Sequence, residues 1–475
     1  MVLPAGFGNA DDVVNFYGIP SPDLPDNALQ SKQFQTLIEL LGSGEIEGFP
    51  SATGSKGSTE YNISALKDVF LNGTQVLQQA AGTTPDSLDF NFRNVSFEPR
   101  FGTPDQTPIA GISETESETN VGVTVTQSTP VSRQITNTNI DAVRITIGFP
   151  SLQKFEDNGD INGAEVALTI QTIENDGTTT TVITDTVKGR TASTYFRDYK
   201  INLPSGTSFP VTIRVNRTTA DSTETTLQNS FRWSSFTEII NESRAYANFA
   251  HVALRFDAET FPNQPKRMYR IKGTKIKIPH NATVRADGSL SYAGTFNGTF
   301  KTDKEWCSDP AWILYDLLTT SKGFGDHIAE SSLDVFSFFS ASQYASEQVD
   351  DGTGTGNTEP RFSCNVVINS QKAAYDIIND LASVMRAMPF YSAGTVNVSC
   401  DKPTDASYIY NLSNVSEAGF AYSSAGKDTK YTVVNVAYFD MEIRDIDYET
   451  TEDTALQSKY GIVTKNLNGF ACTSR

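Results

Sequence analysis

The sequence is poor in the residues that most often build catalytic and metal sites. Its 475 residues include only 3 histidines and 4 cysteines, and no two cysteines have the CxxC spacing of a zinc site. A disulfide framework is not indicated for so long a chain, so we expect free thiols in a reducing cytoplasm. No GxSxG, HExxH or Walker loop occurs either. We therefore expect that the protein is not an enzyme and that it uses no cofactor and no metal.

Basic residues are outnumbered, and long apolar runs are missing. The chain has 37 Lys and Arg against 56 Asp and Glu, a formal net charge of −19. This excess of negative charge argues against a protein that binds nucleic acid or an anionic membrane through a broad basic surface. No apolar run reaches the roughly 18 residues that span a bilayer. The N-terminus also lacks the basic start and apolar core of a secretory signal.

Residues 85–235 show the alternating pattern of β-strands. The alternation is clear in AVRITIGF (142–149), AEVALTIQTI (164–173) and FPVTIRVNR (209–217). A period of two residues places one side of each strand in a core and the other side in solvent. Turns rich in Asn, Asp and Gly separate the runs, which predicts a sandwich. Strand-like runs also flank this stretch, and Asn72-Gly73 predicts a hairpin because both residues tolerate positive φ.

Helical signals begin late in the chain. Asp309-Pro310 predicts a helix start, because Asp can cap the first amides and Pro is tolerated where no N–H is needed. Further helices are predicted over 332–348 and 371–388, the latter ended by Pro389. Strands over 430–440 and a short helix over 451–461 follow.

Two glycine-containing loops resemble ligand-binding motifs, but we predict that they are a connector and a turn. DDGTGTGNTE (350–359) is predicted to be a connector, because a dinucleotide loop needs a strand before it and a helix after it. EDNGDINGAE (156–165) resembles half of a calcium loop, but Thr169 stands where a bidentate acid is required. We predict a β-turn there, with a weak divalent site near Asp160 as the alternative.

Lysines and tryptophans also leave alternatives open. Lys275 and Lys277 would share one face of a strand in KGTKIKIP, which suits a solvated face or an acidic neighbouring chain; direct contact with DNA phosphates is the alternative. Trp306 and Trp312 flank the predicted helix start. We expect them to anchor a core, with a sugar platform as the alternative.

Several segments together resemble the tail tip protein J family of lambda-like siphophages, the central tip or host-specificity proteins. In the family's order, from about residue 35 to 475, they are LLGSGEIEG with KDVFLNGTQV, LQNSFRWSSFTEII, MYRIKGTKIKIPHN, YAGTFNGTFK, DPAWILYDLLTTSKGFG, TEPRFSCNVVI, QKAAYDIINDLASVMRAMPFY and KNLNGFACTSR. Trp, Pro and Gly stand at matching places, which makes the match specific. The motif residues that we single out are structural: Trp306, Pro310, Trp312, Gly323, Gly325, Pro360 and Arg361.

The resemblance implies a phage tail hub fold, because family members resemble the baseplate hub of contractile tails. That fold is mainly β, with two small β-barrels, an inserted sandwich-like domain and an α+β domain. Mapped onto this sequence, the parts are an extended N-terminal arm (1–31), a first hub barrel (32–84 and 236–300), an inserted β-rich domain (85–235), an α+β hub domain (301–405) and part of a second hub barrel (406–475).

The resemblance also implies partners. A homotrimer would form a ring in the virion that caps the tail tube of a non-contractile-tailed bacteriophage. Two similar barrels per chain would let this trimer dock onto a sixfold ring of distal tail protein. The ring would hold the C-terminal segment of the tape measure protein and give phage DNA a conduit during ejection. Other tail tip assembly proteins are implied too, with an iron–sulfur tip protein as one candidate.

Family members continue well beyond this sequence, into fibronectin-like modules and a receptor-reading C-terminus. We therefore expect that only the N-terminal part is present and that the host receptor is contacted through the missing C-terminal region. Two other classes remain. A carbohydrate- or receptor-binding adhesin would also suit the sandwich and the aromatics. A peptidoglycan hydrolase would need paired carboxylates in a cleft, and nothing singles out such a pair.

Overall fold

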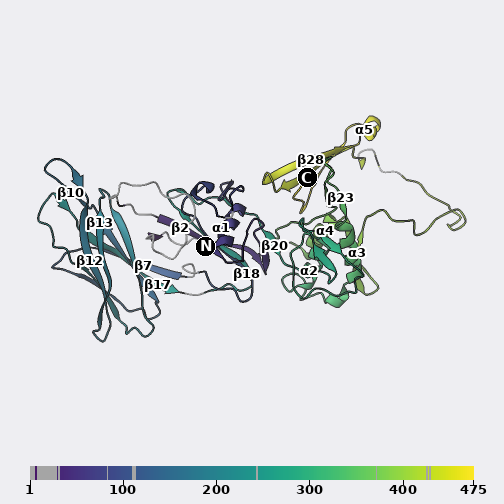
Figure 1. Cartoon of the computed structure of the whole chain (residues 1–475). Coiled ribbons are helices and arrows are strands. Elements are labelled where there is room, and N and C mark those ends of the chain that lie inside the picture. Colours follow the sequence, from purple (N-terminus) through teal and green to yellow (C-terminus); the bar gives the residue numbers. More distant parts are fainter. Residues whose placement is uncertain are drawn as a thin grey trace. The chain divides into compact units, whose positions relative to one another are not determined.

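The computed structural model describes residues 6–7, 29, 33–82, 84–109, 114–241, 244–370, 372–423, 426 and 429–475 (Figure 1). Most of the expected N-terminal arm, 1–31, lies outside these residues. Its one described strand, β1 (Gly6–Phe7), pairs antiparallel with β2 (Gln33–Ser43). The chain divides into two compact units, Met1–Gly273 and Thr274–Arg475.

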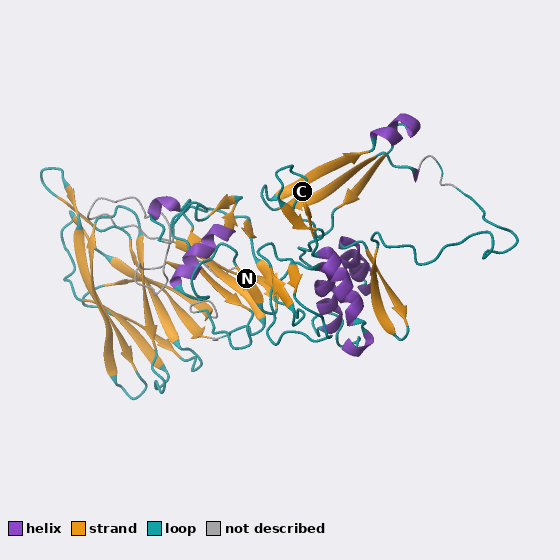
Figure 2. Cartoon of the chain, turned by 45° about the vertical axis from the view of Figure 1, so that its right-hand side comes forward, coloured by secondary structure: helices purple, strands orange, loops and turns teal. Residues whose placement is uncertain are grey.

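Strands dominate the chain and helices are few (Figure 2), which confirms the mainly β class. The described sheets contain two to four strands, almost all antiparallel; the exception is the parallel pair of β27 (Val433–Asp440) and β29 (Thr464–Asn468). Among the described residues no sheet closes into a barrel. The two hub barrels expected within the chain therefore stay a prediction. No helix in the described ranges has the length and apolar character needed to cross a bilayer.

The predicted sandwich is present in the first unit as two four-stranded sheets. One has the order β14-β9-β17-β7 and the other the order β13-β12-β15-β8. The first contains β7 (Glu114–Val125), β9 (Ala142–Phe149), β14 (Tyr195–Asn202) and β17 (Phe231–Asn241). The second contains β8 (Val131–Ile135), β12 (Ala164–Ile173), β13 (Thr179–Gly189) and β15 (Val211–Arg217). Three short strands from the same stretch of sequence form a separate small sheet: β10 (Gln153–Phe155), β11 (Ile161–Asn162) and β16 (Leu227–Gln228).

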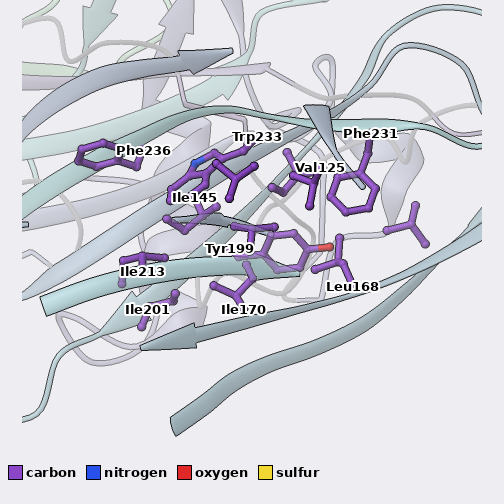
Figure 3. Packing of buried hydrophobic residues seen from close by; sticks show 14 of the residues in the cluster. Val125, Ile145, Leu168, Ile170, Tyr199, Ile201, Ile213, Phe231, Trp233 and Phe236 are labelled. Carbon is purple, nitrogen blue, oxygen red and sulfur yellow. The ribbon is translucent and has the colours of Figure 1, made fainter. Parts of the chain in front are cut away.

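Alternate residues of these strands fill the space between the two sheets. Along β12, Val166, Leu168 and Ile170 are buried while their neighbours are more exposed, as a period of two requires. Figure 3 shows side chains from both sheets meeting in this core. Trp233 is fully buried, and its indole N–H donates to the carbonyl of Ser235 at 2.8 Å. Each such side chain contributes roughly 1.5–3 kcal/mol through burial.

Another four-stranded sheet of the first unit joins segments from both sides of the sandwich sequence. Its order is β1-β2-β18-β6, with β18 (Phe249–Asp257) in contact with both β2 and β6 (Ser96–Phe101). Thus β6 belongs to this sheet although its sequence lies within 85–235. Around the sheet lie β3 (Ile46–Gly48), α1 (Thr59–Ala65), η1 (Leu66–Asp68), β4 (Val69–Leu71), β5 (Thr74–Gln75), η2 (Ser87–Asp89), β19 (Arg267–Tyr269) and β20 (Lys272–Thr274).

The predicted hairpin joins β4 and β5. Asn72 and Gly73 have φ values of 51° and 82°, the left-handed conformations that a type I′ turn requires. The basic run is different from the prediction, because β20 ends at Thr274. Lys275 and Lys277 therefore do not share the face of one strand, and Lys277 instead pairs with Glu330 at 3.2 Å.

The second unit combines helices with short hairpins. Its helices are α2 (Pro310–Thr319), η3 (Glu330–Ser332), α3 (Val335–Ala345), α4 (Ala374–Val384) and α5 (Thr454–Tyr460). Its remaining strands are β21 (Ala282–Val284), β22 (Leu290–Tyr292), β23 (Gln348–Asp350), β24 (Thr358–Pro360), β25 (Ala387–Ser392), β26 (Thr395–Cys400) and β28 (Asp445–Glu452). The segment from Ile276 to Phe296 packs with α2, α3 and α4 in one core.

Helix α4 is shorter than the predicted 371–388. It ends at Val384, and Arg386 has a φ of 53°, which breaks the helical path. Met388 and Pro389 lie in β25 instead, paired with β26. Met388, the last residue of the predicted helix, is instead a strand residue that is 70 % exposed. The glycine-rich loop of residues 351–357 connects β23 to β24, as the connector prediction requires.

Candidate functional site

The predicted helix start is a buried polar junction. One carboxylate oxygen of Asp309 accepts the backbone N–H groups of Ala311 and Trp312, each at 3.0 Å. The other oxygen accepts the hydroxyls of Ser342 at 2.5 Å and Ser346 at 3.0 Å, both from α3 and its C-terminal end. Burial raises the pKa of Asp309, and these hydrogen bonds oppose that rise only in part. The carboxyl group thus joins two helices.

The tryptophans take different positions at this junction. Pro310 is the first residue of α2, and Trp312 is fully buried. Its indole N–H donates to the hydroxyl of Tyr292 at 2.9 Å, so Trp312 anchors a core, as expected, and cannot offer a sugar platform. Trp306 is half-buried, and a side chain at Gly288 would stand 2.8 Å from its ring.

Two glycines close the turn after α2. A Cβ atom at Gly323 would lie 2.0 Å from the carbonyl oxygen of Leu317, and one at Gly325 would lie 2.3 Å from that of Thr319. The N–H of the intervening Phe324 donates to the Leu317 carbonyl at 2.8 Å. Close backbone approach therefore requires glycine at both positions.

The last two motif residues follow the β23–β24 hairpin. Pro360 ends β24, and the Arg361 guanidinium donates to the Glu347 carboxylate at 2.9 Å. The guanidinium carbon also lies 4.7 Å from the ring centre of Tyr344. The structure thus places five motif residues around α2 and two near the end of α3. Their role as a structural motif remains a prediction, and every contact found here holds the fold.

Sequence reasoning missed two features of this unit. The first is the set of distant junction partners Tyr292, Ser342 and Ser346, for which no local signal exists. The second is exposed apolar surface, for which the signal was present. The hairpin of residues 387–400, AMPFYSAGTVNVSC, contains no charged residue. We name it the uncharged hairpin; its exposed large apolar side chains are Met388, Phe390 and Tyr391.

A second exposed apolar stretch follows directly. Residues 403–423 contain neither helix nor strand. We name these residues the arm, which is separate from the expected N-terminal arm of residues 1–31. Six large apolar side chains of the arm are between 44 % and 91 % exposed: Tyr408, Ile409, Tyr410, Leu412, Phe420 and Tyr422. Isolated exposed apolar residues are normal, but a series of them marks an interaction site.

The sandwich carries a shallow groove of about 550 Å³ on the sheet that contains β9. Its lining is mostly polar and includes Glu118, Asn120, Gly122, Thr146, Phe196, Arg232, Ser234 and Ser235. A Cβ at Gly148 would lie 3.1 Å from Phe196 Cε1, so the Phe196 ring leans over this glycine. Ser235 Oγ donates to Glu118 at 2.6 Å.

Other candidate positions are structural in their contacts. In the predicted turn near Asp160, Asn158 donates to the Asp160 carboxylate at 2.7 Å and accepts its backbone N–H at 3.0 Å. The described residues contain no group of three His, Cys, Asp or Glu side chains placed to hold a metal. All four cysteines are free, as predicted, and burial raises the pKa of the Cys364 thiol to about 12.

Comparison with known proteins gives the family. The model of the FNIII-A domain of tip attachment protein J matches residues 115–242, which is the sandwich. Tip attachment protein J of Escherichia phage SECphi27 is 34 % identical over 413 residues, or 86 % of this chain. The chain belongs to the tip attachment protein J family. The protein of Escherichia phage SECphi4 is 32 % identical over 456 residues, or 95 % of this chain.

Membership in the tip attachment protein J family makes the chain a structural protein of the phage tail tip, and hence a virion component. The chain spans only 33 % and 38 % of the length of these two relatives.

The similarity to solved structures is too low to support an argument about fold or function. A carbohydrate-binding module of Ruminococcus flavefaciens Cel9A is 12 % identical and covers 26 % of this chain and 97 % of its own, with a TM-score of 0.19. The infectious bursal disease virus Gt strain structure gives 14 % identity, coverage of 51 % and 80 %, and a TM-score of 0.17.

Proposed function

We propose that the chain is a tail tip hub protein of a non-contractile-tailed phage. Three copies form a ring that caps the tail tube, holds the end of the tape measure protein and gives DNA a conduit during ejection. The observation that carries this proposal is the identity to tip attachment protein J over 86–95 % of the chain. The exposed apolar surface of the second unit supports it, since an assembly would bury that surface.

The ring would be built from two small barrels per chain. In this proposal residues 32–84 with 236–300 contribute the first, 406–475 contribute to the second, and 85–235 and 301–405 are the inserted and α+β domains. The sheet β28-β27-β29 supports the idea, because both of its outer strands have open edges among the described residues. Open edges invite pairing with another chain, so neighbouring copies would complete the barrels. Six such units from three chains would match a sixfold ring.

The proposed partners follow from this position. The distal tail protein ring would lie on one side, with the tape measure segment and other tail tip proteins, an iron–sulfur tip protein as a candidate among them, at the ring itself. Host receptor contact would run through regions of the family that this chain does not span. Phage DNA would pass through a lumen lined by acidic or neutral residues. The net charge of −19 per chain supports this, because such a wall does not trap phosphates.

Electron microscopy of the chain with tail tubes tests the proposal. Purified protein is mixed with tubes that end in distal tail protein, and the tube ends are imaged. We expect threefold caps at one end of the tube. Tube ends that stay bare at saturating protein would contradict the proposed position.

The second candidate function is carbohydrate binding by the sandwich. The specific observation that favours it is the groove, whose lining combines the aromatic Phe196 with the polar residues Ser235, Asn120 and Arg232. An aromatic face with nearby hydrogen-bonding groups suits a neutral sugar. Calorimetry with cello-, malto- and mannotetraose tests it. Binding that F196A abolishes and F155A, at an exposed phenylalanine outside the groove, preserves would favour this function.

A further inference from the structure

We propose that the arm of one copy docks on the uncharged hairpin of the neighbouring copy. The two surfaces belong to one chain, and each is exposed within that chain. The contact would repeat from copy to copy around the ring. This inference rests on the proposed homotrimer and names the segments that hold it together.

The arm is unusual for a connection inside a compact unit. It joins β26 to β27, and Figure 2 draws it as loop. Structureless connections of this length are uncommon and are usually either functional or linker segments. None of its residues belongs to the three apolar core clusters of the described chain. Its residues therefore contribute little to the folding of their own unit.

The contacts within the arm are local. The rings of Tyr408 and Tyr410 meet at 4.8 Å between centres, and those of Phe420 and Tyr422 at 6.5 Å. Asn414 donates its side-chain amide to the carbonyl of Ile409 at 2.8 Å. These contacts give the arm local shape while its aromatic faces remain free for a partner.

The area available fits a protein interface. A buried aromatic side chain removes about 150–250 Å² from water. The four aromatics of the arm would therefore bury on the order of 600–1,000 Å² if covered, close to the ~800 Å² per partner of a standard interface. A second copy offers a receiving surface of the same character, and no additional protein is needed.

The uncharged hairpin has the chemistry of a receiving surface. Met388 and Phe390 lie two residues apart in β25, on the same face, and both are exposed. An exposed apolar hairpin without a single charge is an aggregation hazard unless something covers it. Pro389 has no N–H, so strand addition along β25 would lack a hydrogen bond there. The arm is therefore expected to dock through side chains on this face.

Among the described residues, no hydrogen bond, ion pair or ring contact joins the arm to its own hairpin. Directly after β26, Asp401 pairs with Arg386 at 2.7 Å, and the Lys402 ammonium lies 5.6 Å from the Tyr344 ring centre. These contacts fix the start of the connection beside α3, to which β26 is also bonded through the Val398 N–H and the Ser337 hydroxyl at 3.1 Å. An arm-to-hairpin contact between copies joins two different surfaces, so it can close into a ring. The arm's charged residues, Asp405 and Glu417, meet no like charge on the hairpin.

A mixing experiment on the full 475-residue chain tests the docking. The arm variant is Y408S/Y410S/L412S, the hairpin variant is M388S/F390S, and the control is L88S/V182S at exposed positions of the first unit. Sedimentation velocity measures mass, and circular dichroism verifies that each variant is folded. We expect wild type and control to be trimers and each variant alone to be monomeric, a loss of at least tenfold in association. An equimolar mixture of the two variants should form one-to-one dimers, because it contains one intact arm and one intact hairpin per pair.

Other results of this experiment distinguish a wrong docking surface from a wrong trimer proposal. If the folded arm variant is still a trimer, the docking is wrong and the hub proposal stands. If the hairpin variant alone is a trimer while the arm variant is monomeric, the arms contact something other than the hairpin, and the docking is wrong. A mixture that stays monomeric also overturns it. A wild-type chain that is monomeric at every concentration overturns the trimer itself.

Discussion

Asp309 caps α2 and holds α3 at the same time, because one carboxylate oxygen accepts two backbone N–H groups and the other accepts two serine hydroxyls. Its side chain is almost completely buried. A buried carboxyl group is expensive unless its hydrogen bonds are made, and here they are. The stability of the second unit should therefore depend on this one residue.

Replacing Asp309 tests the junction directly. D309A removes the cap and leaves the two serine hydroxyls without their acceptor, so it should lower the free energy of unfolding by about 2–3 kcal/mol. D309N can still accept the backbone amides and contact both serines, so its loss should be much smaller. Urea unfolding in a W233F background reports the second unit through Trp306 and Trp312. Equal losses for the two variants would contradict the role of the hydrogen bonds.

The same residue predicts a pH dependence. Burial raises the folded-state pKa of Asp309 above the ordinary value of about 3.9. Its stabilising contribution is therefore complete below about pH 3.9 and is lost as the pH rises through the folded-state pKa. D309N does not titrate, so the unfolding free energy of wild type minus D309N should fall as the pH is raised from about 4 toward neutrality. A difference in unfolding free energy that stays constant or grows with pH would contradict a raised pKa of Asp309.

Gly323 gives a steric prediction at the same scale. G323A would force a Cβ atom to within 2.0 Å of the Leu317 carbonyl oxygen, so it should destabilise the second unit by about 1–3 kcal/mol. The matched control is G426A, at a glycine in the same unit whose Cβ would meet nothing within 4 Å. Thermal unfolding of both variants, followed by circular dichroism, measures the difference. Equal melting temperatures would show that the turn after α2 yields easily.

Among helices, strands and turns, the features that depend on neighbouring residues were predictable from the sequence, and those that depend on distant residues were not. The Asn72-Gly73 hairpin, the strands of the sandwich and the start of α2 were predicted from short patterns, because turn chemistry and alternation act over a few residues. The serines that complete the Asp309 junction are 33 and 37 residues away, so no local pattern indicates them. The pairing of β6 with β18 and the early end of α4 likewise depend on tertiary contacts.

The sandwich should fold by itself. All 23 buried members of its core cluster lie between Val125 and Phe236, and the family domain match covers 115–242. Residues 114–241 expressed alone should therefore unfold cooperatively, with blue-shifted Trp233 fluorescence that urea abolishes. W233A should lower stability by about 3–5 kcal/mol. A fragment that shows red-shifted fluorescence in buffer would contradict an independent core.

At the scale of the whole molecule, the chain combines strong net charge with exposed apolar surface. The charge of −19 opposes close approach of two copies, so the proposed trimer would depend on specific apolar contacts. Those surfaces gather in the second unit, on the arm, the uncharged hairpin and the sheet of β27, β28 and β29. Higher salt screens the repulsion and should therefore strengthen association of the copies.

Native mass spectrometry combined with top-view electron microscopy of the same sample tests whether copies of this chain close into a ring of three, as we propose. We expect a single dominant mass of three times 51.8 kDa and particle averages with threefold symmetry. A dominant single-chain mass, or open chains of variable length, would contradict it.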